Sequence, residues 1–167
     1  NLLCCSPHVY PSSLRSAAAE AGADVVDVAI DAMSGLTSQP SMGAVVSNLK
    51  GSDLDTGLSP TALTPLNTYW ENVRSLYVPF ESGQLSTSSD VYMHEIPGGQ
   101  YTNLMVQCKA MGLWERWEEV LDMYRDVNRL LGDVVKVTPS SKSVGDFALF
   151  LINKRLTAAD VVAEAHR

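Results

Sequence analysis

The clearest periodic pattern of apolar residues lies between residues 114 and 131. Apolar side chains recur there at spacings of three and four residues, which is the period of one helix face, and Gly132 supplies a stop signal after the last of them. The pattern predicts a helix whose apolar stripe is buried in a core. The stripe consists of Trp114, Trp117, Val120, Leu121, Tyr124, Val127, Leu130 and Leu131.

The first fifty residues indicate an alternation of helix and strand. Residues 14–21 have helical composition before Gly22, whereas residues 24–30 are rich in the β-branched residues typical of a strand. Small polar residues then predict a loop over Asp31–Pro40, followed by a helix from about Ser41 to Leu49. This order is typical of an α/β fold, in which ligands gather at the carboxyl ends of strands. The loop is therefore where chemistry is expected.

Beyond Gly51 the alternation stops, and the remainder is predicted to be mainly helical with loops. A final helix is expected after Thr157, which would act as its N-cap, with Asp160 near the positive end of the helix dipole. The other predicted elements are helices over Pro60–Leu76 and Asn103–Met111, a loop-rich segment over Ser82–Gly99 with a short extended piece at Val91–Tyr92, and a helix after Lys142 with Val144, Phe147, Ala148 and Leu151 on one face.

Composition narrows the class of protein. The chain has 167 residues, of which 46% are apolar and 19% charged, so it is long enough to bury a core and too apolar to be disordered. Its three cysteines exclude a disulfide scaffold, and its net charge of −7 disfavours the phosphate contacts of nucleic-acid binding. No stretch approaches the roughly 20 apolar residues of a membrane span. We expect an intracellular protein that binds neither nucleic acid nor membrane.

The segment from Thr138 to Lys142 offers three hydroxyls and an ammonium group at a predicted helix start. Unpaired backbone N–H groups at that end of a helix favour an anion, so the segment could hold a carboxylate. The alternative is that the hydroxyls only cap the helix and that Lys142 is solvated. The residues by themselves leave both interpretations open.

Metal-capable and catalytic side chains are sparse elsewhere. Cys4, Cys5 and His8 lie close together, but nothing downstream completes a set of three or four ligands, so no metal ligand is assigned. His94 is expected to be a solvated loop histidine, and Pro97–Gln100 fits a turn better than a phosphate-binding loop. No Ser/His/Asp arrangement is evident.

Several uninterrupted stretches closely resemble the carboxyltransferase domain of the pyruvate carboxylase family. The resemblance runs, with gaps, from about Ala17 to Leu156. The stretches that carry it are Gly22–Val28, Met33–Gly43, Glu95–Leu104, Leu131–Asp133, Lys136–Lys142 and Val144–Asp146.

The resemblance implies a fold and an activity. Residues 1–50 would form the last part of a TIM (β/α)₈ barrel, and residues 51–167 the mainly helical funnel that extends its catalytic mouth. Because a whole barrel needs about 250 residues, the chain would be a segment of a larger enzyme. In that family, biotin on a carrier domain delivers a carboxyl group to pyruvate, which becomes oxaloacetate. The intact enzyme would be a homotetramer, located in the mitochondrial matrix if the source is a eukaryote.

The resemblance also assigns site residues. Thr138 falls on the catalytic threonine, whose hydroxyl can donate and accept protons between biotin and pyruvate. Ser141 and Lys142 match positions that line the biotin pocket, where Lys142 would favour negative charge on the ureido oxygen.

One departure concerns the divalent metal of the family. Counting back without gaps places Leu3 and Cys5 where the family has its two metal-binding histidines, and Ser6 where it has an aspartate, while His8 is out of register. The segment alone is therefore expected to be inactive. Two alternatives remain, namely a subunit of a biotin-dependent oxaloacetate decarboxylase or transcarboxylase, and a non-catalytic remnant that acts as a binding or scaffold protein. The length of the native polypeptide discriminates the remnant from the enzymes.

Overall fold

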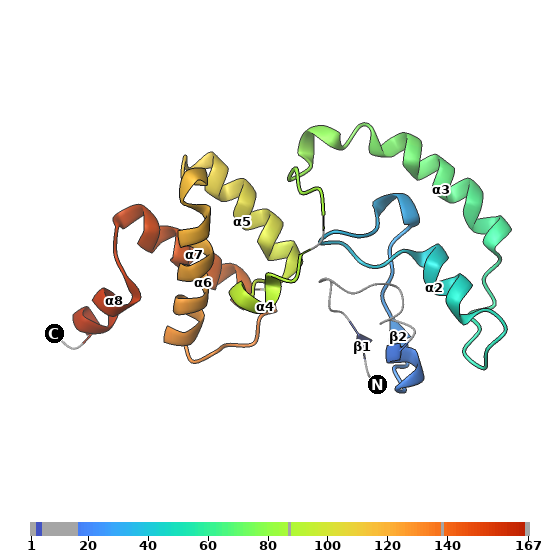
Figure 1. Ribbon diagram of the computed structural model, residues 1–167, viewed down its shortest axis with the longest axis horizontal. Coiled ribbons are helices and arrows are strands. Elements are labelled where there is room, and N and C mark those ends of the chain that lie inside the picture. The colour runs from blue at the N-terminus through green and yellow to red at the C-terminus, as the bar shows by residue number, and fades with distance from the viewer. Residues whose placement is uncertain (1–2, 5–16, 87, 138, 166–167) are drawn as a thin grey trace. The chain divides into compact units, whose positions relative to one another are not determined.

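The computed structural model describes residues 3–4, 17–86, 88–137 and 139–165. The chain divides into two compact units, Asn1–Ser88 and Ser89–Arg167 (Figure 1). Each unit has its own helices.

The first unit contains a two-stranded parallel sheet. Strand β1 (Leu3–Cys4) pairs with β2 (Val25–Val26), and a helical segment at residues 17–20 precedes β2. The prediction of a strand over residues 24–30 was therefore too long. In the described part of the chain only Val25 and Val26 belong to a ladder, while Ala29 makes an isolated parallel bridge with Ser41. Strand length depends on pairing partners, which the local sequence does not reveal.

Three helical elements follow the short sheet in the same unit: the 3₁₀ turn η1 (Asp31–Met33), helix α2 (Met42–Leu49) and helix α3 (Pro60–Arg74). They confirm the predicted order of strand, loop and helix. Helix α2 buries Val45, Val46 and Leu49, and α3 lies against η1 and α2 without burying any residue fully. A further 3₁₀ turn, η2 (Val78–Phe80), ends this helical region.

The second unit is helical in its described part. It contains α4 (Val91–His94), α5 (Gly98–Ala110), the 3₁₀ turn η3 (Trp114–Arg116), α6 (Trp117–Leu130), α7 (Ser140–Lys154) and α8 (Ala158–Ala165). The long helix predicted over 114–131 is confirmed, with a 3₁₀ first turn. The predicted cap of α8 is confirmed as well, because the Asp160 N–H donates to Thr157 Oγ1 at 3.3 Å.

Two predictions in this unit were wrong. Val91–Tyr92 is not extended but begins α4, and α5 begins at Gly98 rather than at Asn103. Two glycines at the start of α5 lower the local helix propensity, which hid this helix start. Burial outweighs that deficit, because Gly98, Gln100 and Leu104 are all buried on α5.

The core of the second unit forms where α6 packs against α7, with α5 against α7 and α4 and α8 against α6 (Figure 1). The predicted stripe supplies its centre, although Trp114 and Leu131 at its ends are 41% and 46% exposed. The core consists of Ile96, Leu104, Met105, Cys108, Trp117, Val120, Tyr124, Val127, Val144, Ala148, Leu149, Leu151 and Ile152.

No helix in the described part of the chain is long and apolar enough to cross a bilayer.

This core predicts that residues 89–167 unfold cooperatively when expressed alone. Replacing the fully buried Leu104 by alanine should lower the free energy of unfolding by roughly 2–5 kcal/mol, because it leaves a cavity. Leu131→Ala is the control, and at that half-exposed site the loss should be about 1 kcal/mol or less. Urea titration followed by circular dichroism measures both. A gradual transition, or equal losses in the two variants, would contradict the prediction.

Candidate functional site

The loop after β2 is held by the carboxylate of Asp31. Its Oδ1 accepts hydrogen bonds from the Ser41 hydroxyl and from the Gly43 N–H, both at 2.7 Å. Its Oδ2 accepts a bond from Asn67 Nδ2 at 2.7 Å, and the Asp31 N–H donates to Asn67 Oδ1 at 3.1 Å. One carboxylate therefore ties the start of the loop to the N-terminal end of α2 and to the middle of α3.

The close approach of Asp31 to α2 requires a glycine at position 43. A Cβ atom there would lie 2.3 Å from Asp31 Oδ2, well inside van der Waals contact. A second bond secures the loop from α3, since Arg74 Nη1 donates to the carbonyl of Ala32 at 2.7 Å. The loop over Asp31–Pro40, where the sequence predicts a functional site, is thus held in place by both α2 and α3.

The second candidate segment is 138–142. Thr138, the predicted catalytic residue, lies outside the described residues. The Ser140 hydroxyl donates to the backbone carbonyls of Val135 and Val137, the latter at 2.5 Å. The N-cap of α7 is Pro139, without a side-chain bond. The alternative in which these hydroxyls cap the helix is therefore wrong for Ser140 and Ser141.

Ser141 lies on the buried side of α7, with 5% of its surface exposed. Its carbonyl accepts a hydrogen bond from the Tyr124 hydroxyl at 3.4 Å, and its N–H donates to the carbonyl of Val137 at 3.2 Å. Burial raises the pKa of Tyr124 to about 12, so the phenol keeps its proton at neutral pH. The first turn of α7 is thereby connected to the core through Tyr124.

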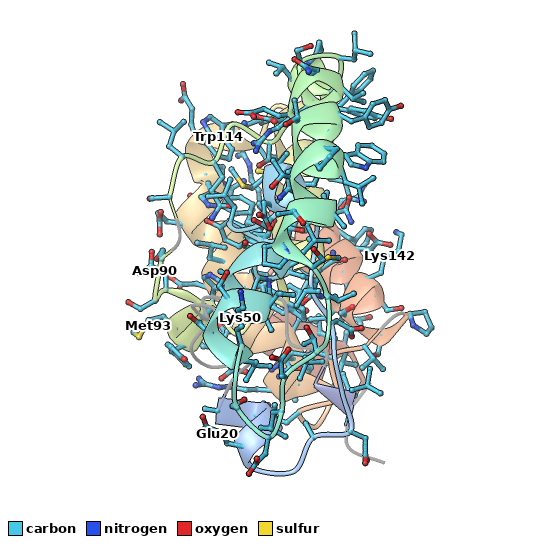
Figure 2. All side chains as sticks on the ribbon, turned by 90° about the vertical axis from the view of Figure 1, so that its right-hand side faces the viewer. Glu20, Lys50, Asp90, Met93, Trp114 and Lys142 are labelled. Atoms are coloured by element: carbon cyan, nitrogen blue, oxygen red, sulfur yellow. The ribbon has the colours of Figure 1, made fainter. Side chains whose placement is uncertain are left out.

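Lys142 projects from α7 and is exposed (Figure 2). Its ammonium group pairs with the carboxylate of Asp146 one turn later, so it is not simply solvated. Such an exposed i,i+4 pair is worth about 0.3–0.5 kcal/mol, which an anionic ligand could readily exceed. The N-terminal end of a helix also favours negative charge, so the described part of this segment suits a carboxylate or a polarised carbonyl oxygen.

His94 is buried rather than solvated, which corrects the expectation from the sequence. Only 6% of its surface is exposed, its Nδ1 accepts the Ile96 N–H at 3.0 Å, and its ring stacks on Tyr101 with centroids 5.0 Å apart. These contacts give it a structural role at the junction of α4 and α5. Its position in a short polar segment gave no signal of this burial.

The remaining candidates are metal ligands and a cysteine. No three His, Cys, Asp or Glu side chains there are grouped so that they could hold a metal ion. Cys5, Ser6 and His8 lie outside the described residues, and only the backbone of Leu3 is described. Cys108 is a free thiol whose pKa is raised by burial, which disfavours the reactive thiolate.

Comparisons with known proteins find similarity over most of the chain. A family model described as a conserved carboxylase domain matches residues 91–167. Pyruvate carboxylase of Aspergillus niger is 52% identical over 149 residues, which are 89% of this chain and 12% of that protein. Mitochondrial pyruvate carboxylase of Rattus norvegicus is 52% identical over 151 residues, which are 89% of this chain and 13% of that protein. The chain thus spans a small part of the length of these relatives.

Solved structures give the same result for the fold. The carboxyl transferase domain of Rhizobium etli pyruvate carboxylase with pyruvate matches with a TM-score of 0.85 and 51% identity, over 90% of this chain and 26% of that chain. The complete enzyme from the same organism matches with a TM-score of 0.85, over 90% of this chain and 15% of that one. The fold is therefore α/β and corresponds to part of such a domain.

The Asp31 contacts predict a local effect on amide hydrogen exchange at Gly43. In Asp31→Ala the Gly43 N–H loses its charged acceptor, so its amide exchange should accelerate roughly 10- to 100-fold. Exchange measured by mass spectrometry over peptides covering residue 43 checks this.

Asp55→Ala is the matched control, because the Asp55 carboxylate also accepts two backbone N–H groups, from Gly51 at 2.8 Å and Gly57 at 2.9 Å. This variant should leave exchange at Gly43 unchanged. Unaltered exchange at Gly43 in Asp31→Ala would contradict the anchoring role.

Proposed function

Because this chain belongs to the pyruvate carboxylase family, we propose that it is a segment of the carboxyltransferase domain of a biotin-dependent pyruvate carboxylase. The observation that carries the proposal is sequence identity of about one half along nearly the whole chain, together with a matching fold. In the intact enzyme the reaction would move a carboxyl group from carboxybiotin to pyruvate and yield oxaloacetate. The segment alone would be inactive, since it lacks most of the domain.

The proposed architecture places residues 1–50 at the end of the barrel and residues 51–167 in the helical funnel. The parallel pair β1–β2, followed by the loop and α2, supports the first assignment, and the run of helices from α3 onward supports the second. In barrels of this type the active site lies at the carboxyl ends of the strands. The Asp31-anchored loop follows β2 and has the place in chain order that such a loop would have.

Thr138 is proposed to move protons between the two reactants. A threonine hydroxyl donates one hydrogen bond and accepts others, so it can give a proton to the ureido nitrogen of biotin and take one from the methyl group of pyruvate. Biotin supplies the activated carboxyl group and belongs to a carrier domain outside this segment.

Ser141 and Lys142 are proposed to contact biotin beside Thr138. The donor chemistry fits, because the exposed Lys142 ammonium is held by a surface pair with Asp146 and can turn to a ureido oxygen that gains negative charge. Ser141 is mostly buried on the same turn, so its contribution would be a short-range contact at the inner wall of the pocket.

The proposed partners are pyruvate, the biotin carrier and the rest of the carboxylase chain. They are supported by solved structures of the Rhizobium etli domain with pyruvate and biocytin, and by that of the complete enzyme. A homotetrameric intact enzyme follows from the family resemblance. A mitochondrial location in a eukaryote is supported by the mitochondrial relatives from rat and mouse.

Replacing Thr138 by alanine in the full-length enzyme should separate the two half-reactions. Oxaloacetate formation should fall at least roughly 100-fold, because a general acid–base group is lost, whereas ATP-dependent carboxylation of biotin should persist. Oxaloacetate production and bicarbonate-dependent ATP cleavage are measured separately. Thr138→Ser keeps the hydroxyl and should retain a substantial part of the activity. Loss of both half-reactions, or of neither, would refute the shuttle.

A further inference from the structure

A set of polar contacts joins three parts of the second unit close to the predicted catalytic segment. Lys136 Nζ lies 2.8 Å from Glu95 Oε2. Asn128 Nδ2 donates to Asp133 Oδ1 at 3.0 Å and lies 3.5 Å from Glu95 Oε2. These four residues, called here the Glu95 network, come from the turn after α4, from α6 and from the segment that leads into α7.

The Glu95 network is more enclosed than an ordinary surface ion pair. Asn128 is fully buried, and the side chains of Lys136 and Glu95 are 23% and 37% exposed. The hydrogen bond from Lys136 holds the pKa of Glu95 below its usual range, so the carboxylate remains charged and the pair intact at neutral pH. Partial burial strengthens such a contact relative to a solvated pair.

Little apolar packing holds the segment between α6 and α7. Val134 packs against the core, but Val135 and Val137 are 77% and 62% exposed. Among the described residues after Val134, the hydrogen bonds of this segment are local, made within it or to the first turn of α7, and the Lys136–Glu95 pair alone reaches another part of the unit. The ion pair is therefore the contact that fixes residue 136 to the body of the unit.

The backbone at Glu95 is also unusual. Its φ of 60° lies in the left-handed region, which a non-glycine residue rarely adopts without support from its surroundings. Asp133, the other carboxylate of the network, has a φ of 54°. Both carboxylates thus sit on turns of fixed geometry, from which they reach toward Asn128 and Lys136.

We propose that Glu95 and Lys136 are positioning residues for carboxyl transfer: their ion pair fixes the backbone that leads directly into Thr138, two residues after Lys136 in the sequence. Neither residue touches the reactants in this role. The inference rests on the proposed function and adds to it the residues that hold the catalytic segment in register. A misplacement of about 1 Å at a reacting group can cost on the order of 100-fold in rate.

The test uses the full-length enzyme with Glu95→Gln and Lys136→Met. The kcat of oxaloacetate formation should fall roughly 10- to 100-fold, with the KM for pyruvate within about twofold of the wild-type value. Biotin carboxylation by ATP should be unchanged. Lys136→Arg keeps the charge, so it should restore most of the rate. A KM for pyruvate near the wild-type value in Glu95→Gln and Lys136→Met shows that the loss of kcat in these variants is not due to failed folding.

Glu119→Gln is the matched control. It breaks another ion pair of the same unit, in which Arg116 Nη2 lies 2.7 Å from Glu119 Oε2, and it should leave kcat unchanged. A kcat within twofold of wild type in both network variants would overturn the positioning role. So would a rise in KM alone, which indicates a ligand contact, or an equal loss in Glu119→Gln. Absence of oxaloacetate formation by the wild-type enzyme would instead overturn the proposed function, and this inference with it.

Discussion

The packing of α6 on α7 is the contact on which the candidate site in the second unit depends. Val120, Tyr124 and Val127 present one fully buried face, and α7 meets it with its own apolar residues. Tyr124 also donates to the carbonyl of Ser141 in the first turn of α7, so the core and the candidate biotin-binding turn share one side chain. This packing therefore contributes to the direction in which Ser141 and Lys142 face.

The packing of α5 on α7 explains a glycine within α7. A Cβ at Gly145 would lie 2.5 Å from Gln100 Nε2 and 3.2 Å from Leu104 Cδ1, both on α5. The absence of that carbon lets α5 approach α7 closely. The usual cost of a glycine inside a helix, about 1 kcal/mol relative to alanine, is offset by this contact. Gly43 plays the corresponding part in the first unit, where it admits the carboxylate of Asp31.

The local periodicity of apolar residues predicted the helices that bury one apolar face. It did not predict elements and contacts that depend on residues far apart in the sequence. The helix over 114–131 was evident because its stripe follows the helical period, whereas α4 and the first turn of α5 are short, polar or glycine-rich. At the candidate site, Ser141 and Lys142 are predicted from a family motif and stay a prediction, whereas the spacing from Lys142 to Asp146 already permits an i,i+4 pair. The bonds between Asp31 and Asn67, and between Glu95 and Lys136, join residues 36 and 41 positions apart. No local pattern contains that information.

In both long-range contacts, a carboxylate holds a loop that has little apolar packing. A loop that must stay open to a ligand cannot bury apolar side chains, so the hydrophobic effect cannot hold it in place. A carboxylate has about four acceptor positions, and one such side chain can therefore hold several donors from different elements. Asp31 receives a hydroxyl, an amide and a backbone N–H, and Glu95 receives an ammonium group. Under the proposed function, both contacts keep a loop ordered while its outer surface remains free for the reactants.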